Sequence, residues 1–171
     1  MKTPFCNFDL KTGVLCPNCS QLIEKGAYTM LDFEISRIFL NMEKTYPFLE
    51  KAVYVKSIEV NGLLIIILRG ISEAYRGLLR QVEHKISRLN LPRRYKNIRI
   101  IIDKGDPRFL VEQLVSPAHL VSYTVVWFPD GSSEYVFRVK LSDMRRIPLP
   151  LQVLNNALSK ILGKPAKIAI I

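Results

Sequence analysis

The chain has 171 residues, of which 49% are hydrophobic, so it is long enough to bury one large core or two small ones and is not a disordered tail. Its formal net charge of +10 at pH 7 favours polyanionic partners, namely nucleic acid, acidic lipid headgroups or acidic proteins. No targeting signal precedes the first periodic segment, and the apolar run at residues 63–68 is too short to span a bilayer, so the sequence predicts a soluble, cytoplasmic protein without a membrane partner.

All three cysteines lie within the first 19 residues. Cys16 and Cys19 form a C-x2-C knuckle, a spacing that lets two thiolates reach one tetrahedral ion. Cys6 lies ten residues before Cys16, across a stretch at 8–15 that is expected to form a hairpin around Gly13. The sequence therefore predicts a zinc ion held by these three residues, with a structural role because 27 residues are too few to fold alone.

A structural zinc site normally has four ligands, and the chain has no fourth cysteine. The fourth ligand could be Asp9, His84, His119, a water molecule or a residue of another chain. The alternative hypothesis is that the cysteines are reduced thiols that pack as small side chains, or that two of them form a disulfide.

A helix is predicted to start at Thr29, with Asp32 three residues later, and to end near Tyr46-Pro47. Strands at 52–60 and 63–69 follow, joined by Asn61-Gly62, a dipeptide typical of tight hairpins. The second of these strands is nearly all aliphatic and is expected to be central. Gly70 and Ser72 then start a second helix that stops at 90–92, and a third strand runs over 97–102.

The same order returns in the second half of the chain. We expect a short helix at 107–115, strands at 120–128 and 134–140 joined by a turn at Gly131, a helix from Pro150 to Gly163 and a strand at 166–171. Gly62 and Gly131 are 69 residues apart, as are the two ends of the last strands, which is typical of an old duplication or of two independent uses of a common α+β unit, and duplication is favoured. The predicted fold class is α+β, with a cysteine knuckle at 1–27 and two ββαβ units at 28–104 and 105–171.

Positive charge is concentrated in the middle of the chain. Residues 69–108 hold eleven of the 25 Lys and Arg and only four acidic residues, and most of the eleven are arginine. Arginine suits phosphate because its planar fork donates two parallel hydrogen bonds, and it can stack on bases. The alternative is a solvated face paired with Glu73, Glu83 and Asp103. The candidate nucleic-acid-binding residues are Arg69, Arg76, Arg80, Arg93, Arg94, Lys96 and, at the equivalent turn of the second half, Arg145 and Arg146.

Catalysis is not expected from this sequence. There is no G-x-x-x-x-G-K-[ST] and no G-x-G-x-x-G, and the two histidines have no motif around them. A zinc ion with three cysteine ligands could activate water as in deaminases, but the H-x-E signature of that class is absent. The sequence predicts a protein that is not an enzyme and has no small-molecule substrate.

A cysteine-rich N-terminus followed by two units, each a hairpin, a helix and a strand, resembles archaeal NusA-like proteins, which are transcription elongation or termination factors built around tandem KH domains. The resemblance covers about residues 50 to 171 and rests on the order and spacing of elements. It implies binding of single-stranded RNA. The G-x-x-G clamp of KH domains is missing, because Gly70 and Gly77 are seven residues apart and the second half has only 141–149 at that place.

Two functions are therefore expected from the sequence. The first is RNA binding, RNA being favoured over DNA, through phosphate contacts of the arginine-rich segment. The second is docking on RNA polymerase or the ribosome through the cysteine knuckle.

Overall fold

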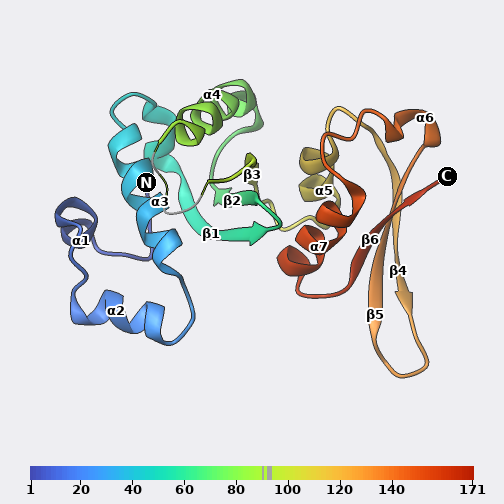
Figure 1. Ribbon diagram of the computed structural model, residues 1–171, viewed down its shortest axis with the longest axis horizontal. Coiled ribbons are helices and arrows are strands. Elements are labelled where there is room, and N and C mark those ends of the chain that lie inside the picture. Colours follow the sequence, from blue (N-terminus) through green and yellow to red (C-terminus); the bar gives the residue numbers. More distant parts are fainter. Residues whose placement is uncertain (90, 92–93) are drawn as a thin grey trace. The chain divides into compact units, whose positions relative to one another are not determined.

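The computed structural model describes residues 1–89, 91 and 94–171. The chain divides into two compact units, residues 1–57 with 64–102 and residues 58–63 with 103–171. It has mixed α and β structure, with a cysteine cluster at its N-terminus and two three-stranded sheets accompanied by helices (Figure 1). The predicted α+β class is thus confirmed, and the division into 1–27, 28–104 and 105–171 stays a prediction.

The N-terminal segment forms two short helices, α1 (Asn7–Thr12) and α2 (Pro17–Glu24). The predicted hairpin at 8–15 is wrong. Gly13 does lie at a turn, but it is the left-handed C-cap of α1, with φ 80°, and its N–H donates to the Asp9 carbonyl over 2.7 Å. The chain therefore changes direction at the C-terminal cap of a helix and not at the turn of a hairpin.

Helix α3 (Met30–Met42) starts where the sequence predicts, in a capping box. The Thr29 Oγ1 accepts from the Asp32 N–H at 3.2 Å, and the Asp32 carboxylate accepts from the Thr29 N–H at 2.7 Å. The helix ends four residues before Tyr46, and a 3-10 turn, η1 (Pro47–Lys51), leads into the first sheet. The apolar face of α3 buries Phe33, Ile35 and Phe39.

The first sheet has the order β1-β2-β3. Strands β1 (Val53–Val60) and β2 (Leu63–Arg69) meet at Asn61-Gly62, where both residues have positive φ, 46° and 80°, as the sequence predicts. The central position predicted for β2 is confirmed, and residues 63–68 are all buried. The 3-10 turn η2 (Glu73–Tyr75), helix α4 (Arg76–Ser87) and strand β3 (Asn97–Ile102) complete this part.

The second unit repeats this element order. Helix α5 (Pro107–Val115) is followed by β4 (Leu120–Trp127), β5 (Ser133–Val139), the short α6 (Leu141–Met144), α7 (Leu151–Leu162) and β6 (Ala166–Ile170). In the order β4-β5-β6, β4 is antiparallel and β6 parallel to the central β5. Phe137 and Val139 of β5 are fully buried, as are Leu154 and Leu158 of α7. None of the helices in the described part of the chain is long and apolar enough to cross a membrane.

Candidate metal centre and basic surface

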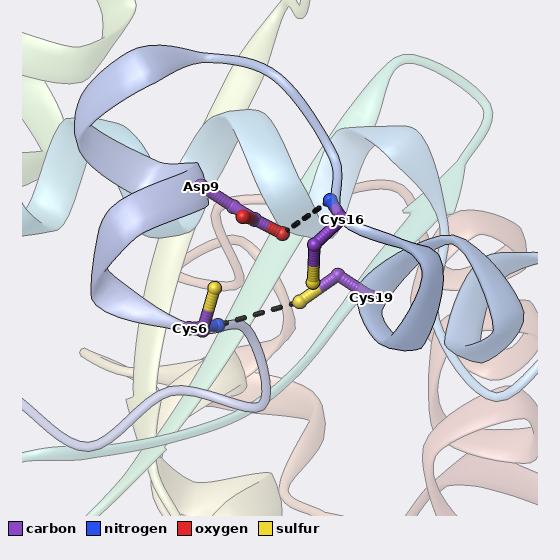
Figure 2. A group of neighbouring side chains, drawn as sticks. All are labelled: Cys6, Asp9, Cys16 and Cys19. Carbon is purple, nitrogen blue, oxygen red and sulfur yellow. Dashed lines mark hydrogen bonds between the residues drawn. The ribbon is translucent and has the colours of Figure 1, made fainter.

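Four potential ligands converge at the N-terminal helices. The Sγ atoms of Cys6, Cys16 and Cys19 and a carboxylate oxygen of Asp9 all lie within 4.8 Å of one another (Figure 2). Tetrahedral coordination with metal–sulfur bonds near 2.3 Å places sulfur atoms roughly 3.8 Å apart, so small inward movements complete the geometry. These four side chains could hold a metal ion.

The two helices present their ligands in the same way. Cys6 is the N-cap of α1 and Asp9 lies in its first turn, while Cys16 is the N-cap of α2 and Cys19 lies in its first turn. The backbone N–H of Cys6 donates to Cys19 Sγ over 3.4 Å, and the N–H of Cys16 donates to Asp9 Oδ2 over 2.8 Å. Each helix thus donates a backbone hydrogen bond to a candidate ligand on the other helix. The positive N-terminal ends of both helices face the cluster of thiol and carboxylate groups.

Asp9 is the residue that completes the set. It is fully buried, and its Oδ1 has no hydrogen-bond partner. A buried carboxylate oxygen without a donor is costly unless a cation takes that place. The hydrogen bond from the Cys16 N–H holds the pKa of Asp9 well below its usual range, so the group is an anion at neutral pH.

The thiols range from exposed Cys6 to buried Cys19. Burial raises the pKa of the Cys19 thiol to about 12, so this thiol stays protonated at neutral pH unless a cation stabilises the thiolate. Cys19 packs in a small core with Phe5, Leu10 and Phe33 of α3. The cysteine segment is therefore attached to α3 of the first unit through apolar contacts, whereas its candidate ligands join α1 to α2.

Among the candidates for the fourth ligand, the geometry favours Asp9. His84 is exposed on α4 and His119 is exposed before β4, and neither belongs to the cluster found among the described residues. A sequence signal for Asp9 was available, because Cys6-x2-Asp9 repeats the spacing of Cys16-x2-Cys19. The spacing places both members of each pair on the first turn of a helix.

The predicted basic residues of the first unit lie on or near α4. Arg69 ends β2, Arg76 and Arg80 lie one turn apart on α4, and Arg94 and Lys96 precede β3. All are exposed except Arg76, which is half-buried. Arg93 lies outside the described residues.

A pocket at the end of α4 brings two arginines together. It has a volume of about 360 Å³ and is lined by Arg88, Arg94, Tyr95 and the apolar Leu89, Leu91 and Ile98, with Ser87. Arg88 was not among the predicted site residues, although its place on the polar side of the helix was evident from the sequence. Arg99 is less available, because it pairs with Glu83 over 3.9 Å.

In the second unit, Arg145 and Arg146 follow α6 and are exposed. Arg146 pairs with Asp143 over 3.2 Å, and this contact keeps the pKa of Asp143 low. The pair occupies the turn before α7, as the sequence predicts.

Comparison with known proteins assigns no family. No family model matches the sequence, and no curated protein matches it. A solved structure titled "Crystal structure of APE1850" is similar with a TM-score of 0.41 and 20% sequence identity, over 65% of this chain and 80% of that chain. This weak similarity assigns neither a fold nor a function to the chain.

Proposed function

We propose that the chain is a non-catalytic, zinc-stabilised RNA-binding protein, related to the archaeal NusA-like factors with tandem KH domains and acting in transcription elongation or termination. The observation that carries the RNA-binding part is the pocket at the end of α4, where Arg88, Arg94 and Tyr95 meet. The zinc part rests on the four converging ligands.

Zinc fits the ligand set because thiolates favour zinc over harder divalent ions such as magnesium and calcium. Three sulfur atoms and one carboxylate fill four tetrahedral positions, so no position remains open for a substrate or a reactive water. A closed site of this kind has a structural role. Here it joins α1 and α2, which together have too small a core to hold each other.

RNA fits the α4 pocket because its size and chemistry suit one exposed nucleotide. Pockets of about 300 Å³ and more accommodate small ligands. The guanidinium groups of Arg88 and Arg94 can hold phosphate, and the ring of Tyr95 is suited to stacking on a base. Arg80 and Lys96 are exposed on α4 and before β3, and they add positive charge to the same unit.

The relation to KH proteins is supported by the order of elements, which is the same in both units: a helix, a hairpin, a short helical turn, a longer helix and a last strand. Without a G-x-x-G clamp, the chain would hold RNA through charge and stacking, and its sequence preference would be weak.

A salt titration of RNA binding tests the proposal. With a single-stranded RNA oligonucleotide, we expect log K to fall linearly with log salt, and neutralisation of Arg88 and Arg94 to glutamine to reduce the slope by about 1.4, roughly 0.7 per lost phosphate contact. The matched control neutralises the exposed Lys25 and Lys44 to glutamine and should leave the slope unchanged. Binding that does not depend on salt, or equal slopes for the two double variants, would exclude this surface.

A second function, docking on RNA polymerase or the ribosome, is favoured by two apolar side chains next to the metal centre. Phe8 of α1 and Val14 after it are 72% and 68% exposed. Phe8→Ser with Val14→Ser keeps all four ligands and should abolish co-purification with the larger assembly from nuclease-treated lysate. Retention of the complex by this variant would argue against docking through the knuckle.

A further inference from the structure

The strand β4 presents an unusual run of exposed apolar side chains. Between residues 121 and 128, six large hydrophobic side chains are at least one third exposed, and Trp127 reaches 69%. They are Val121, Tyr123, Val125, Val126, Trp127 and Phe128. Because successive side chains of a strand point to opposite faces, Tyr123, Val125 and Trp127 share one face of the sheet and Val126 lies on the other. Exposed apolar side chains grouped in this way mark an interaction site.

The backbone of β4 is also available. In the described part of the chain, β4 is the edge of the order β4-β5-β6 and pairs only with β5. Figure 1 shows the β4–β5 hairpin running beyond the ends of α5 and α7, which leaves its outer half without a helix over it. An edge strand offers unpaired N–H and C=O groups to another strand.

In the first sheet, the β1 edge is paired with another segment of the same chain. There Lys2 pairs with Val53 in parallel, with Lys2 N–H to the Ala52 carbonyl and Tyr54 N–H to the Lys2 carbonyl at 2.8 Å each. The chain thus covers one edge with its own N-terminus and leaves β4 open.

Among the strands that the structure describes, β4 alone has no charged residue. The others carry Lys56 and Glu59, Arg69, Arg99, Glu134 and Arg138, and Lys167. Charged residues on an edge strand normally prevent pairing with another chain. Their absence from this edge, in a protein with 23% charged residues, indicates that the strand pairs with a partner.

We propose that the partner is a second copy of this chain, which adds its own β4 antiparallel to the first. In a two-fold pairing the same strand meets itself, so any net charge on it would face a like charge. Strand β4 has no charged residue, so its self-pairing brings no like charges together. The result is a sheet of six strands, in which Tyr123 and Val125 of one copy lie on the same face as those of the other. This inference does not rest on RNA binding.

The lack of cationic side chains on β4 argues against RNA as its ligand. Residues 120–128 hold no lysine or arginine that could meet a phosphate. Lys164 lies over the Trp127 ring, 5.6 Å from its centroid, and Lys167 pairs with Glu134 at 2.6 Å. The phosphates of a nucleic acid stacked on β4 would meet few cationic side chains. An uncharged, apolar strand matches the surface of β4 better.

Sedimentation velocity on nuclease-treated protein tests the proposal, with fluorescence as a second readout, because Trp127 is the only tryptophan in the chain. The wild type should sediment as a dimer that dissociates on dilution, with Trp127 emission moving to longer wavelength over the same range. Val126→Lys should weaken association by about tenfold or more, because two added charges approach each other. Thr124→Lys changes an exposed polar side chain of the same strand and should weaken the dimer to a similar extent.

Leu78→Lys on α4 is the matched control, since Leu78 is 37% and Val126 38% exposed. It should leave the dimer intact, and circular dichroism should show that all variants are folded. A monomeric wild type, or a dimer that survives both β4 variants, would overturn the proposal. So would Trp127 emission that responds to an RNA oligonucleotide and not to protein concentration.

Discussion

Two buried aspartates of the first unit differ in what surrounds their oxygens. Asp32 accepts five hydrogen bonds, from the backbone N–H and hydroxyl of Thr29, the hydroxyl of Tyr54, and the backbone N–H and hydroxyl of Ser57. Asp9 has a bond on one oxygen and none on the other. The protein satisfies the first carboxylate, whereas the second has one buried oxygen that a metal ion could bind.

Asp9→Asn should weaken metal binding on the order of 100-fold or more, because the amide loses the negative charge and is a poorer ligand. A competition titration with a chromophoric zinc chelator measures the change. Glu24→Gln removes an equal charge from an exposed position of α2. It should leave the zinc affinity within about twofold of the wild type, since a solvent-exposed charge interacts only weakly with the site. Equal affinities of wild type and Asp9→Asn would show that Asp9 is not a ligand.

Asp32→Asn should lower the free energy of unfolding by about 2–4 kcal/mol at pH 7, because the hydrogen bonds of a buried carboxylate are lost or weakened. Despite burial, these bonds lower the pKa of Asp32 in the folded state. Its contribution is therefore complete above the unfolded pKa near 3.9 and is lost as the pH falls through the folded pKa.

Urea unfolding of wild type and Asp32→Asn from pH 7 to pH 3 measures this effect. The difference between the two proteins should stay constant down to about pH 5 and then shrink. A difference that grows toward low pH would contradict the assigned direction.

At the scale of elements, local chemistry accounts for most of what the sequence predicted. Asn61-Gly62 determines the first hairpin because both residues tolerate positive φ. Asp106 caps α5 by accepting from the Arg108 N–H at 2.9 Å, and Pro107 follows at the first helical position. The hairpin predicted at 8–15 is wrong because Cys6 and Cys16 occupy N-cap positions without a side-chain cap bond, so no Ser, Thr, Asp or Asn marks helices α1 and α2 in the sequence.

Gly70 joins β2 to the turn before α4, where the backbone conformation and a close backbone neighbour both disfavour a side chain. Its φ is +75°, and a Cβ there would meet the Lys51 carbonyl oxygen at 2.9 Å. Gly70→Ala should cost about 1–2 kcal/mol for the backbone conformation alone and more for the clash. Gly131→Ala, with φ +82° and nothing within 4 Å, isolates the conformational part. Chemical denaturation should show a larger loss for Gly70→Ala, and equal losses would contradict the close approach.

At the scale of the whole molecule, features that depend on tertiary packing do not follow from local sequence patterns. The convergence of Asp9 with three cysteines depends on how α1 and α2 lie on α3. The exposure of β4 is equally a tertiary property, because a run such as Val125-Val126-Trp127 is expected to be buried until the edge position of its strand is known. The basic segment was predicted, whereas the pocket formed by Arg88 and Arg94 required the fold.

Removal of the proposed zinc ion should affect the two units unequally. Chelation leaves buried ligands without their cation, so hydrogen exchange should accelerate in α1 and α2. Strands β4 to β6 have a separate core in the second unit and should keep their protection. Uniform loss of protection over the whole chain would contradict the structural division.

The central claim is that Cys6, Asp9, Cys16 and Cys19 hold one zinc ion, and native mass spectrometry tests it most directly. We expect reduced protein purified without chelator at neutral pH to carry one zinc ion per chain, and Cys16→Ala with Cys19→Ala to carry none. A wild-type chain that is folded, reduced and free of metal under these conditions would contradict the account.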